Sequence, residues 1–313
     1  MSKTDLASSL SESGAFDVEV QGGKIPVNFK RAGSKTRIVI FSFHGAIDRT
    51  TRRIPAYAPF LPGIGNLAHQ VSVSDPTMLV EGSFSMSWYA GHEGFKTQDI
   101  LKQVFEDIIE ALDVDKVIFL GASSGGFASL YYSWHFPGSV CVAACPQTCL
   151  ALYYKRHVDR YLAEGWPSMS GIEALSNTIC TDVGALYSQR IPNTVIYLQS
   201  TGDHKHFVTQ LIPFLSNLKV TDKDRSFILN SGYWGKLGHS GSVPREAFMP
   251  WIKAILMSQV FDADALMQTH YELNATPGKI AAPSSAPRQN KDDFAAADIE
   301  LASKITAWQH GRA

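Results

Sequence analysis

The feature that most constrains the fold is an alternation of two hydrophobic patterns along the chain. Short runs of β-branched and aromatic residues, such as "RIVIFSF", "KVIFL", "SVCVAAC", "TVIYLQS" and "RSFILN", are typical of strands covered on both faces. Between them lie segments with apolar residues every three to four positions, most clearly at 97–112 and 245–261. Alternating strands and helices predict an α/β protein with a doubly wound, mostly parallel sheet and helices on both faces.

The rest of the chain can be divided around this pattern. Residues 1–15 are expected to form a flexible N-terminus, and 16–262 one α/β domain that opens with a hairpin over 16–31. Weaker strand signals occur at 71–75 and 83–91, and Thr97 is a candidate N-cap. Residues 263–313 are expected to be a linker rich in Ala, Pro and Ser, followed by a short amphipathic helix within 294–310.

Composition excludes several classes of function. Lys and Arg together number 28 against 29 Asp and Glu, so no excess positive charge is available to neutralise a nucleic acid backbone. The chain has no apolar run of about 18 residues, and its first residues do not have the pattern of a signal peptide. We therefore expect no nucleic acid partner, no membrane span and a cytoplasmic location. The four cysteines are expected to be buried free thiols.

The segment "GASSGG" (121–126) lies between a predicted strand and a predicted helix. Gly121-x-Ser123-x-Gly125 is the nucleophile-elbow pattern, in which a sharp turn holds the serine in a strained conformation and larger flanking residues would clash. A second register, centred on Ser124, also has small flanking residues. We favour Ser123 because Gly121 directly follows the strand. The spacings of phosphate-binding loops are absent.

A serine hydroxyl becomes a nucleophile when a histidine accepts its proton and a carboxylate orients that histidine. Asp203 lies just past the strand "TVIYLQS", and His239 lies in a Gly-rich loop past the last strand. Because parallel strands share one carboxyl edge, we expect both residues to converge on Ser123. Asp203 could instead cap the following helix, and His239 could be an ordinary loop histidine. The alternative acids are Asp182, Asp222 and Asp224.

Negative charge on a tetrahedral intermediate requires backbone donors that are already in position. One donor is expected to be the N–H of Ser124, at the start of the helix. The second is expected to come from the loop "HGA" after the strand "RIVIFSF", from Ala46 or Gly45.

Three more side chains follow predicted strands and could line a substrate pocket. They are His44, Trp88 and Tyr89. His44 could instead be a core histidine, and for the two aromatic residues packing in the core is an equally open interpretation. The spacing of His204 and His206 behind Asp203 raises the question of a metal, but no other cluster of ligands supports one. We expect no metal and no cofactor.

The stretches "FSFHGA", "GASSGG", "TGD" and "GHSG" occur in the order used by the α/β-hydrolase superfamily, which the sequence resembles over about residues 15–260. The resemblance implies an eight-stranded sheet, acyl transfer through an acyl-serine, and a small helical cap over the site formed by 147–190. "DPTM", "SWYAG" and "CPQT" are similar to bacterial hydrolases linked to surface-glycan and secretion genes. "HGA" replaces the longer HGGG loop of lipases and esterases, which leaves the substrate class open.

The sequence therefore predicts a serine hydrolase that cleaves a carboxylic ester, either a small molecule or one linked to a glycan. An acyltransferase with the same three residues is the close alternative. A second alternative, of another class, is a hydrolase-like binding protein without catalytic function that acts in a complex. The C-terminal tail is the expected place for a protein partner or for self-association.

Overall fold

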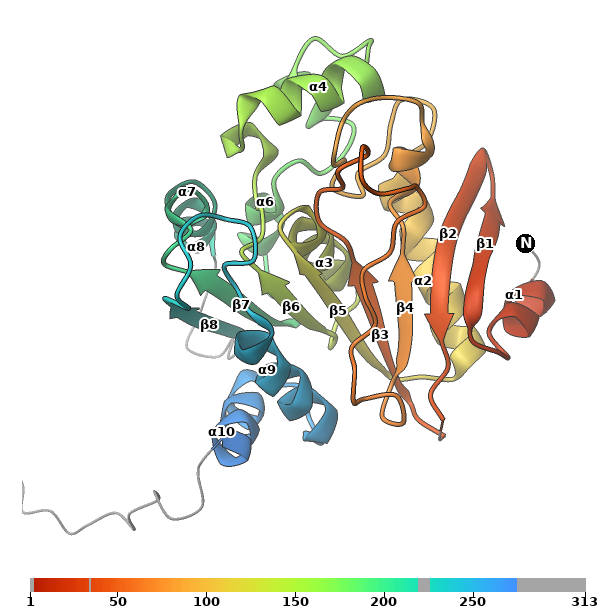
Figure 1. Cartoon of the computed structure of the whole chain (residues 1–313), viewed down its shortest axis with the longest axis vertical. Coiled ribbons are helices and arrows are strands. Elements are labelled where there is room, and N and C mark those ends of the chain that lie inside the picture. Colours follow the sequence, from red (N-terminus) through yellow and green to blue (C-terminus); the bar gives the residue numbers. More distant parts are fainter. Residues whose placement is uncertain (1–2, 34, 219–225, 275–313) are drawn as a thin grey trace, which may run out of the picture. The chain divides into compact units, whose positions relative to one another are not determined.

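A computed structural model describes residues 3–33, 35–218 and 226–274, and its centre is one eight-stranded sheet in the order β1-β2-β4-β3-β5-β6-β7-β8 (Figure 1). The strands are β1 (Gly14–Val20), β2 (Gly23–Lys30), β3 (Ile38–Phe43), β4 (His69–Val73), β5 (Lys116–Ala122), β6 (Val140–Ala144), β7 (Thr194–Ser200) and β8 (Phe227–Gly232). β2 pairs antiparallel with β1 and β4, and all other pairs are parallel. The predicted α/β class with a mostly parallel sheet is confirmed.

Helical segments precede, connect and follow the strands. They are α1 (Lys3–Ser9), η1 (Pro76–Leu79), α2 (Thr97–Leu112), α3 (Ser124–His135), η2 (Leu150–Leu152), α4 (Lys155–Gly165), α5 (Ile172–Leu175), α6 (Val183–Tyr187), α7 (His204–His206), η3 (Phe207–Leu211), α8 (Ile212–Asn217), α9 (Arg245–Met257) and α10 (Ala263–Asn274). None of the helices in this described part of the chain is long and apolar enough to cross a bilayer.

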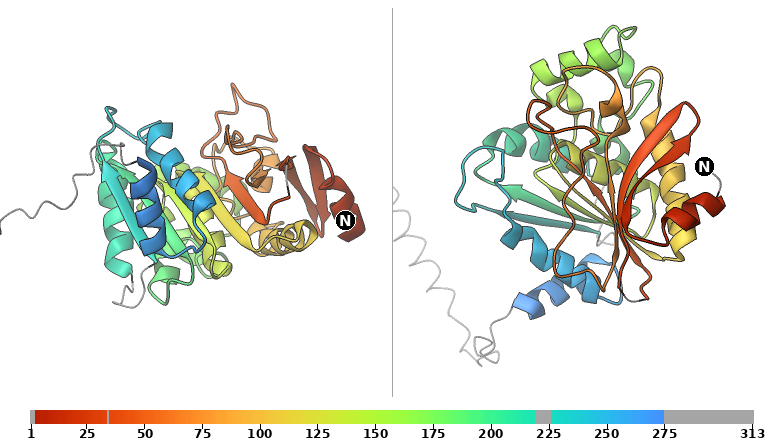
Figure 2. Two further views of the ribbon diagram at one scale, coloured as in Figure 1. Left: turned by 90° about the horizontal axis from the view of Figure 1, so that it is seen from below. Right: turned by 45° about the vertical axis from the view of Figure 1, so that its right-hand side comes forward.

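Side chains alternate between the two faces of the sheet and build two separate cores. In β3, Val39 and Phe41 belong to the larger core, which the sheet shares with α2 and α3, whereas Ile40 belongs to the core beneath α9 and α10. The left view of Figure 2 shows α9 and α10 on one side of the sheet. Helices on both faces explain why the central parallel strands β3, β5, β6 and β7 are apolar at most positions.

The ends of the domain differ from the prediction. The residues expected to be a flexible N-terminus include α1, whose Leu6 and the following Leu10 are buried in the larger core. The domain also continues beyond 262, because α10 buries Ala263 and Leu266 and the ring of His270 stacks on Trp251 at 3.8 Å. Both segments are short and only weakly amphipathic, so their packing was not evident from composition.

The chain divides into two units, 1–273 and 274–313, and only Asn274 of the second unit is described. The helix predicted within 294–310, and with it the proposed partner-binding tail, lies outside the described residues. Two predictions about secondary structure within the first unit were also wrong. Residues 83–91 form a loop instead of a strand, and Thr97 is the first residue of α2, with Lys96 at the N-cap.

The segment 147–190 contains η2, α4, α5 and α6 between β6 and β7. In Figure 1, α4 lies above the sheet at the top of the view. The ring centroid of Tyr153, two residues before α4 in this segment, lies 6.0 Å from that of Trp88 and 5.7 Å from that of His206. The segment thus reaches residues that follow β4 and β7.

Candidate active site

The turn between β5 and α3 has the strained geometry expected of an elbow. Ser123 has φ 57° and ψ −121°, a conformation that costs a non-glycine residue roughly 1–3 kcal/mol. A Cβ on Gly121 would lie 2.1 Å from the carbonyl oxygen of Gly125, and a Cβ on Gly125 would lie 2.5 Å from that of Phe43. Only glycine fits at both positions, so the two glycines allow the helix to start against the sheet.

The structure brings Ser123, His239 and Asp203 into one hydrogen-bonded row. The Oγ of Ser123 lies 2.8 Å from Nε2 of His239, and Nδ1 of His239 lies 2.5 Å from Oδ2 of Asp203. Ser124, the alternative nucleophile, is only 2% exposed and has no such contact among the described residues. In this geometry the imidazole can accept the Ser123 proton while the carboxylate holds its other nitrogen.

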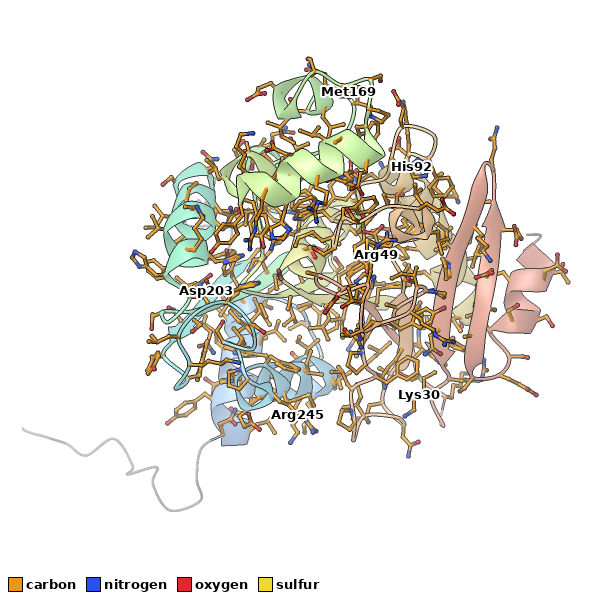
Figure 3. All side chains as sticks on the ribbon, turned by 45° about the horizontal axis from the view of Figure 1, so that its top comes forward. Lys30, Arg49, His92, Met169, Asp203 and Arg245 are labelled. Carbon is orange, nitrogen blue, oxygen red and sulfur yellow. The ribbon has the colours of Figure 1, made fainter. Side chains whose placement is uncertain are left out.

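Asp203 makes both of the contacts that the sequence left as alternatives. Its Oδ1 accepts the backbone N–H of His206 and caps α7, while its Oδ2 faces His239. Figure 3 labels Asp203, which follows β7. Of the other acids, Asp182 instead caps α6 through the N–H of Gly184, and 222 and 224 lie outside the described residues.

His206 is a second histidine on the same carboxylate. Its Nδ1 lies 3.0 Å from Oδ1 of Asp203, and its ring stacks on His239 with centroids 3.8 Å apart. Burial would raise the pKa of Asp203, but its hydrogen bonds to His206 and His239 and its electrostatic attraction to the two rings outweigh burial and hold that pKa below its usual value. Burial lowers the pKa of His206, despite its hydrogen bond to Asp203. The site therefore favours an ionised carboxylate beside a neutral His206.

The loop after β8 places His239 by packing on the turn after β7. The N–H of Gly238 donates to the carbonyl oxygen of Gly202 at 2.9 Å, and a Cβ on Gly202 would lie 2.2 Å from the carbonyl oxygen of Lys236. The close approach thus depends on Gly202. Gly238 and Gly241 have a different role, because both have positive φ, 81° and 66°, which favours glycine.

Two of the expected oxyanion donors, Gly45 and Ser124, lie at the elbow. A Cβ built on Gly45 would be 3.6 Å from Cβ of Ser123, so the "HGA" loop passes directly beside the serine. Ser124 begins α3, where the first backbone N–H groups have no partner within the helix. No hydrogen bond from the N–H of Gly45 or Ala46 to another described residue is found. Their function as an oxyanion hole stays a prediction.

His44 and Tyr89 are buried and bind backbone, so neither presents its ring to an open pocket. The N–H of His44 donates to the Tyr89 hydroxyl at 2.8 Å, which in turn donates to the carbonyl oxygen of Val73. Nε2 of His44 accepts the N–H of Asp75, which fixes the ring proton on Nδ1, facing the carbonyl oxygen of Gly45. These contacts hold the loop beside Ser123, and contact of the two side chains with substrate stays a prediction.

Trp88 is also buried, 1% exposed, and its indole N–H donates to Oε1 of Gln147 at 2.5 Å. Nε2 of the same Gln147 lies 2.7 Å from Oγ of Ser123. Trp88 and Tyr89 both have positive φ, near 55°, and are held by the buried Asp75, whose Oδ2 accepts the N–H of Tyr89 at 2.8 Å.

Asp203, His206 and His239 form the group within the described residues that could hold a metal, with ligand atoms within 4.8 Å of one another. His204, one of the two histidines that raised the question from sequence, is exposed and is not part of it. Both Nδ1 atoms already face the carboxylate, and Nε2 of His239 faces Ser123. A metal would have to displace these contacts, so the donor set fits proton transfer better than metal binding.

An apolar cavity of about 310 Å³ adjoins the elbow through Gly121 and Ala122. It lies between the segment 58–62, the ends of β3, β5 and β6, and the start of α9, with Phe248 and Met249 in its wall and Arg245 also lining it. A larger cavity of about 680 Å³ lies between the start of α2 and the segment 147–190, and contains none of Ser123, Asp203 and His239.

No family model matches the chain, and no curated protein matches it. Solved structures do match. The capsule O-acetyltransferase of Neisseria meningitidis serogroup A is 16% identical with a TM-score of 0.56, over 76% of this chain and 93% of that one. Acetyl xylan esterase 1 from Thermoanaerobacterium is 14% identical with a TM-score of 0.51, over 85% of each chain. An acylaminoacyl peptidase from Pyrococcus horikoshii is 15% identical with a TM-score of 0.54, over 82% of this chain and 44% of that one.

These likenesses and the strand order show that the chain has the α/β-hydrolase fold. The resemblance recognised in the four sequence stretches is thereby confirmed at the level of the fold. At such low identity the neighbours do not transfer an activity, and the chemistry must be argued from the side chains themselves.

Sequence reasoning missed two residues of the site, Gln147 and His206, in the roles that their contacts indicate. Gln147 lies in "CPQT", which was noted only as part of a resemblance, and His206 was considered only as a metal ligand. Both are fully buried polar side chains. Gln147 bonds to Ser123 and Trp88 from distant segments, whereas His206 bonds to the nearby Asp203 and stacks on the distant His239. A buried glutamine after a strand end is the one signal that could have drawn attention to Gln147.

Proposed function

We propose that the protein is a serine hydrolase that acts on a carboxylic ester through an acyl-serine intermediate. The observation that carries the proposal is the row from Ser123 Oγ to His239 Nε2 and from His239 Nδ1 to Asp203 Oδ2, at 2.8 and 2.5 Å, on a strained elbow. An ion pair that serves only the stability of the fold seldom includes a serine in a strained conformation and a histidine that is hydrogen-bonded on both ring nitrogens.

In the proposed reaction, Ser123 Oγ attacks the ester carbonyl carbon while its proton passes to Nε2 of His239. The ionised Asp203 stabilises the imidazolium that forms, and the N–H groups of Ser124 and of Ala46 or Gly45 hold the oxyanion. The imidazolium then protonates the departing alcohol. Water, deprotonated by His239, releases the acid and restores the serine. Neither a metal nor a cofactor is required.

An acyltransferase is the second candidate, in which a substrate hydroxyl replaces water in the second step. The capsule O-acetyltransferase among the structural neighbours favours this candidate, and glycan-linked esters are a reasonable class of substrate for either reaction. The cytoplasmic location and the docking of a partner on the C-terminal tail stay predictions.

The test is labelling with a fluorophosphonate, followed by intact-mass measurement, on the wild type, Ser123→Ala and Ser124→Ala. We expect one adduct on the wild type and on Ser124→Ala, and none on Ser123→Ala. Loss of labelling only in Ser124→Ala would assign the other serine. A folded wild type that takes no label would favour a binding protein without catalytic function. To distinguish hydrolysis from transfer, the protein is then given an acetyl ester together with added sugars, and the fraction of acetyl groups transferred to water is compared with the fraction transferred to sugar hydroxyls.

A further inference from the structure

Gln147 contacts the nucleophile with both its side chain and its backbone. Its Nε2 lies 2.7 Å from Oγ of Ser123, and its backbone N–H donates to the carbonyl oxygen of Ser123 at 3.1 Å. Its Oε1 lies 2.5 Å from the indole nitrogen of Trp88. The side chain is fully buried, so water does not compete for these hydrogen bonds.

The contact with Trp88 determines which way the amide faces. An indole N–H can only donate, so the amide atom opposite it must be the oxygen. The NH₂ group of Gln147 is therefore directed at Ser123, whose oxygen accepts it. The serine hydroxyl proton is then directed to Nε2 of His239, 2.8 Å away. Each group in this row therefore donates a hydrogen bond to the next: Trp88 to Gln147, Gln147 to Ser123, and Ser123 to His239.

We propose that Gln147 is a catalytic residue, a hydrogen-bond donor to the nucleophilic oxygen, and that Trp88 is the positioning residue that orients it. This inference rests on the proposed function. One lone pair of Oγ accepts the Gln147 N–H, and the hydroxyl proton faces His239. The remaining lone pair is the one that attacks.

The donor acts in both half-reactions. As the Oγ–C bond forms, the Oγ proton passes to His239 and the carbonyl π pair moves onto the carbonyl oxygen. The Gln147 N–H offsets the negative charge on Oγ as that proton leaves. When water, deprotonated by His239, attacks the acyl-enzyme and the tetrahedral intermediate collapses, the Oγ–C bond breaks, and Oγ keeps the electron pair and receives the water-derived proton from His239. The same N–H again stabilises the oxygen.

The loop that carries Trp88 is built to hold its indole in this position. Trp88 and Tyr89 have positive φ angles, 55° and 56°, which residues other than glycine rarely adopt. The buried Asp75 stabilises this conformation by accepting the N–H of Tyr89 and the hydroxyl of Ser87, at 2.8 and 2.6 Å. The indole ring also packs edge-on against Tyr161, with centroids 5.4 Å apart.

The experiment compares Gln147→Leu, Trp88→Phe and the double variant by their rate of fluorophosphonate labelling and by kcat and KM for an acetyl ester. We expect Gln147→Leu to lower the labelling rate and kcat by about 10–100-fold with little change in KM, because the lost donor acts on the reacting oxygen. Trp88→Phe should lower them by about 3–10-fold. The double variant should be no slower than Gln147→Leu, because Trp88 acts through Gln147.

Two variants serve as matched controls. Gln70→Leu removes a buried glutamine whose amide bonds to the backbone of Leu61, and Trp251→Phe removes a buried indole N–H without a partner among the described residues. Both lie outside the site, and both should label at the rate of the wild type. Equal slowing in these controls would overturn the inference, as would a Gln147→Leu variant that labels like the wild type, or a Trp88→Phe effect that persists in full in the double variant.

Gln147→Glu decides the question if the leucine variant does not fold. Its carboxylate can still accept the Trp88 N–H but would take the Ser123 proton away from His239, whereas its protonated form can donate. The ratio of its labelling rate to that of the wild type should therefore increase as the pH is lowered from about 8 to about 5. A constant ratio over this range would contradict a donor role. Absence of labelling in the wild type would instead refute the proposed function.

Discussion

Substitution of Gly121 by Ala should remove both stability and reactivity. The new Cβ would lie 2.1 Å from the carbonyl oxygen and 2.3 Å from the carbonyl carbon of Gly125, and 2.8 Å from Oγ of Ser129. Nonbonded heavy atoms are ordinarily about 3.5 Å apart, so the start of α3 would have to move by more than about 1 Å. The obstructing atoms are mostly backbone, so rotation of a side chain cannot relieve the clash.

Overpacking of this kind costs about 3 kcal/mol or more, which corresponds to a fall in Tm of roughly 6–12 °C for a domain of this size. The same shift would carry Ser123 Oγ away from His239 Nε2, now 2.8 Å distant, so labelling should fall at least about 100-fold. Thermal unfolding and the rate of fluorophosphonate labelling measure the two effects. Gly14→Ala is the control, because a Cβ at Gly14 meets nothing within 4 Å. A Gly121→Ala variant with the Tm and labelling rate of the wild type would refute the steric argument.

Three further predictions concern His206, a metal and α10. The folded-state pKa of His206 is lowered from 6.5, so its contribution to stability is complete above that pH and is lost as pH falls below it, by at most about 1.4 kcal/mol per pH unit. His206→Asn should therefore show a shallower loss of unfolding free energy between about pH 7 and pH 5 in urea titrations, and an unchanged slope would contradict this. Exhaustive treatment with EDTA should change neither Tm nor labelling, and a fall in either that added Zn²⁺ restores would show that Asp203, His206 and His239 hold a metal. A chain ending at residue 262 should melt roughly 5–10 °C below one ending at residue 274, because it loses the burial of Leu266, and equal Tm values would show that α10 does not stabilise the domain.

The central strands could be predicted because the sheet is covered on both faces. β3, β6 and β7 are almost entirely buried and β5 is buried over its middle, which forces continuous apolar runs that are visible in the sequence. The segment 83–91 shows the limit of this signal. Its apolar and polar residues alternate, but Asp75 binds its backbone and Trp88 and Tyr89 take left-handed conformations, so no strand forms.

The candidate site could be predicted where a residue of the required chemical type directly follows the end of a predicted strand. Ser123, Asp203 and His239 each come after a recognisable strand, and shared strand polarity brings them together. Gln147 and His206 could not be assigned because their roles depend on contacts with Trp88 and with the second oxygen of Asp203. The Trp88–Gln147 contact joins distant segments and leaves no spacing pattern, and the short spacing from Asp203 to His206 does not show that the two histidines share one carboxylate.

The most direct test of the account is to locate the covalent adduct. The folded chain is treated with an excess of a chromogenic acetyl ester, quenched in acid and digested, and the peptide that carries the added acetyl group is sequenced by mass spectrometry. The account predicts that the acetyl group is on Ser123. If His239 is replaced by a residue that cannot activate water, an ester reactive enough to acylate Ser123 without it should cause the acetyl-enzyme to accumulate. An adduct on another residue, or turnover of the ester by Ser123→Ala at the rate of the wild type, would contradict it.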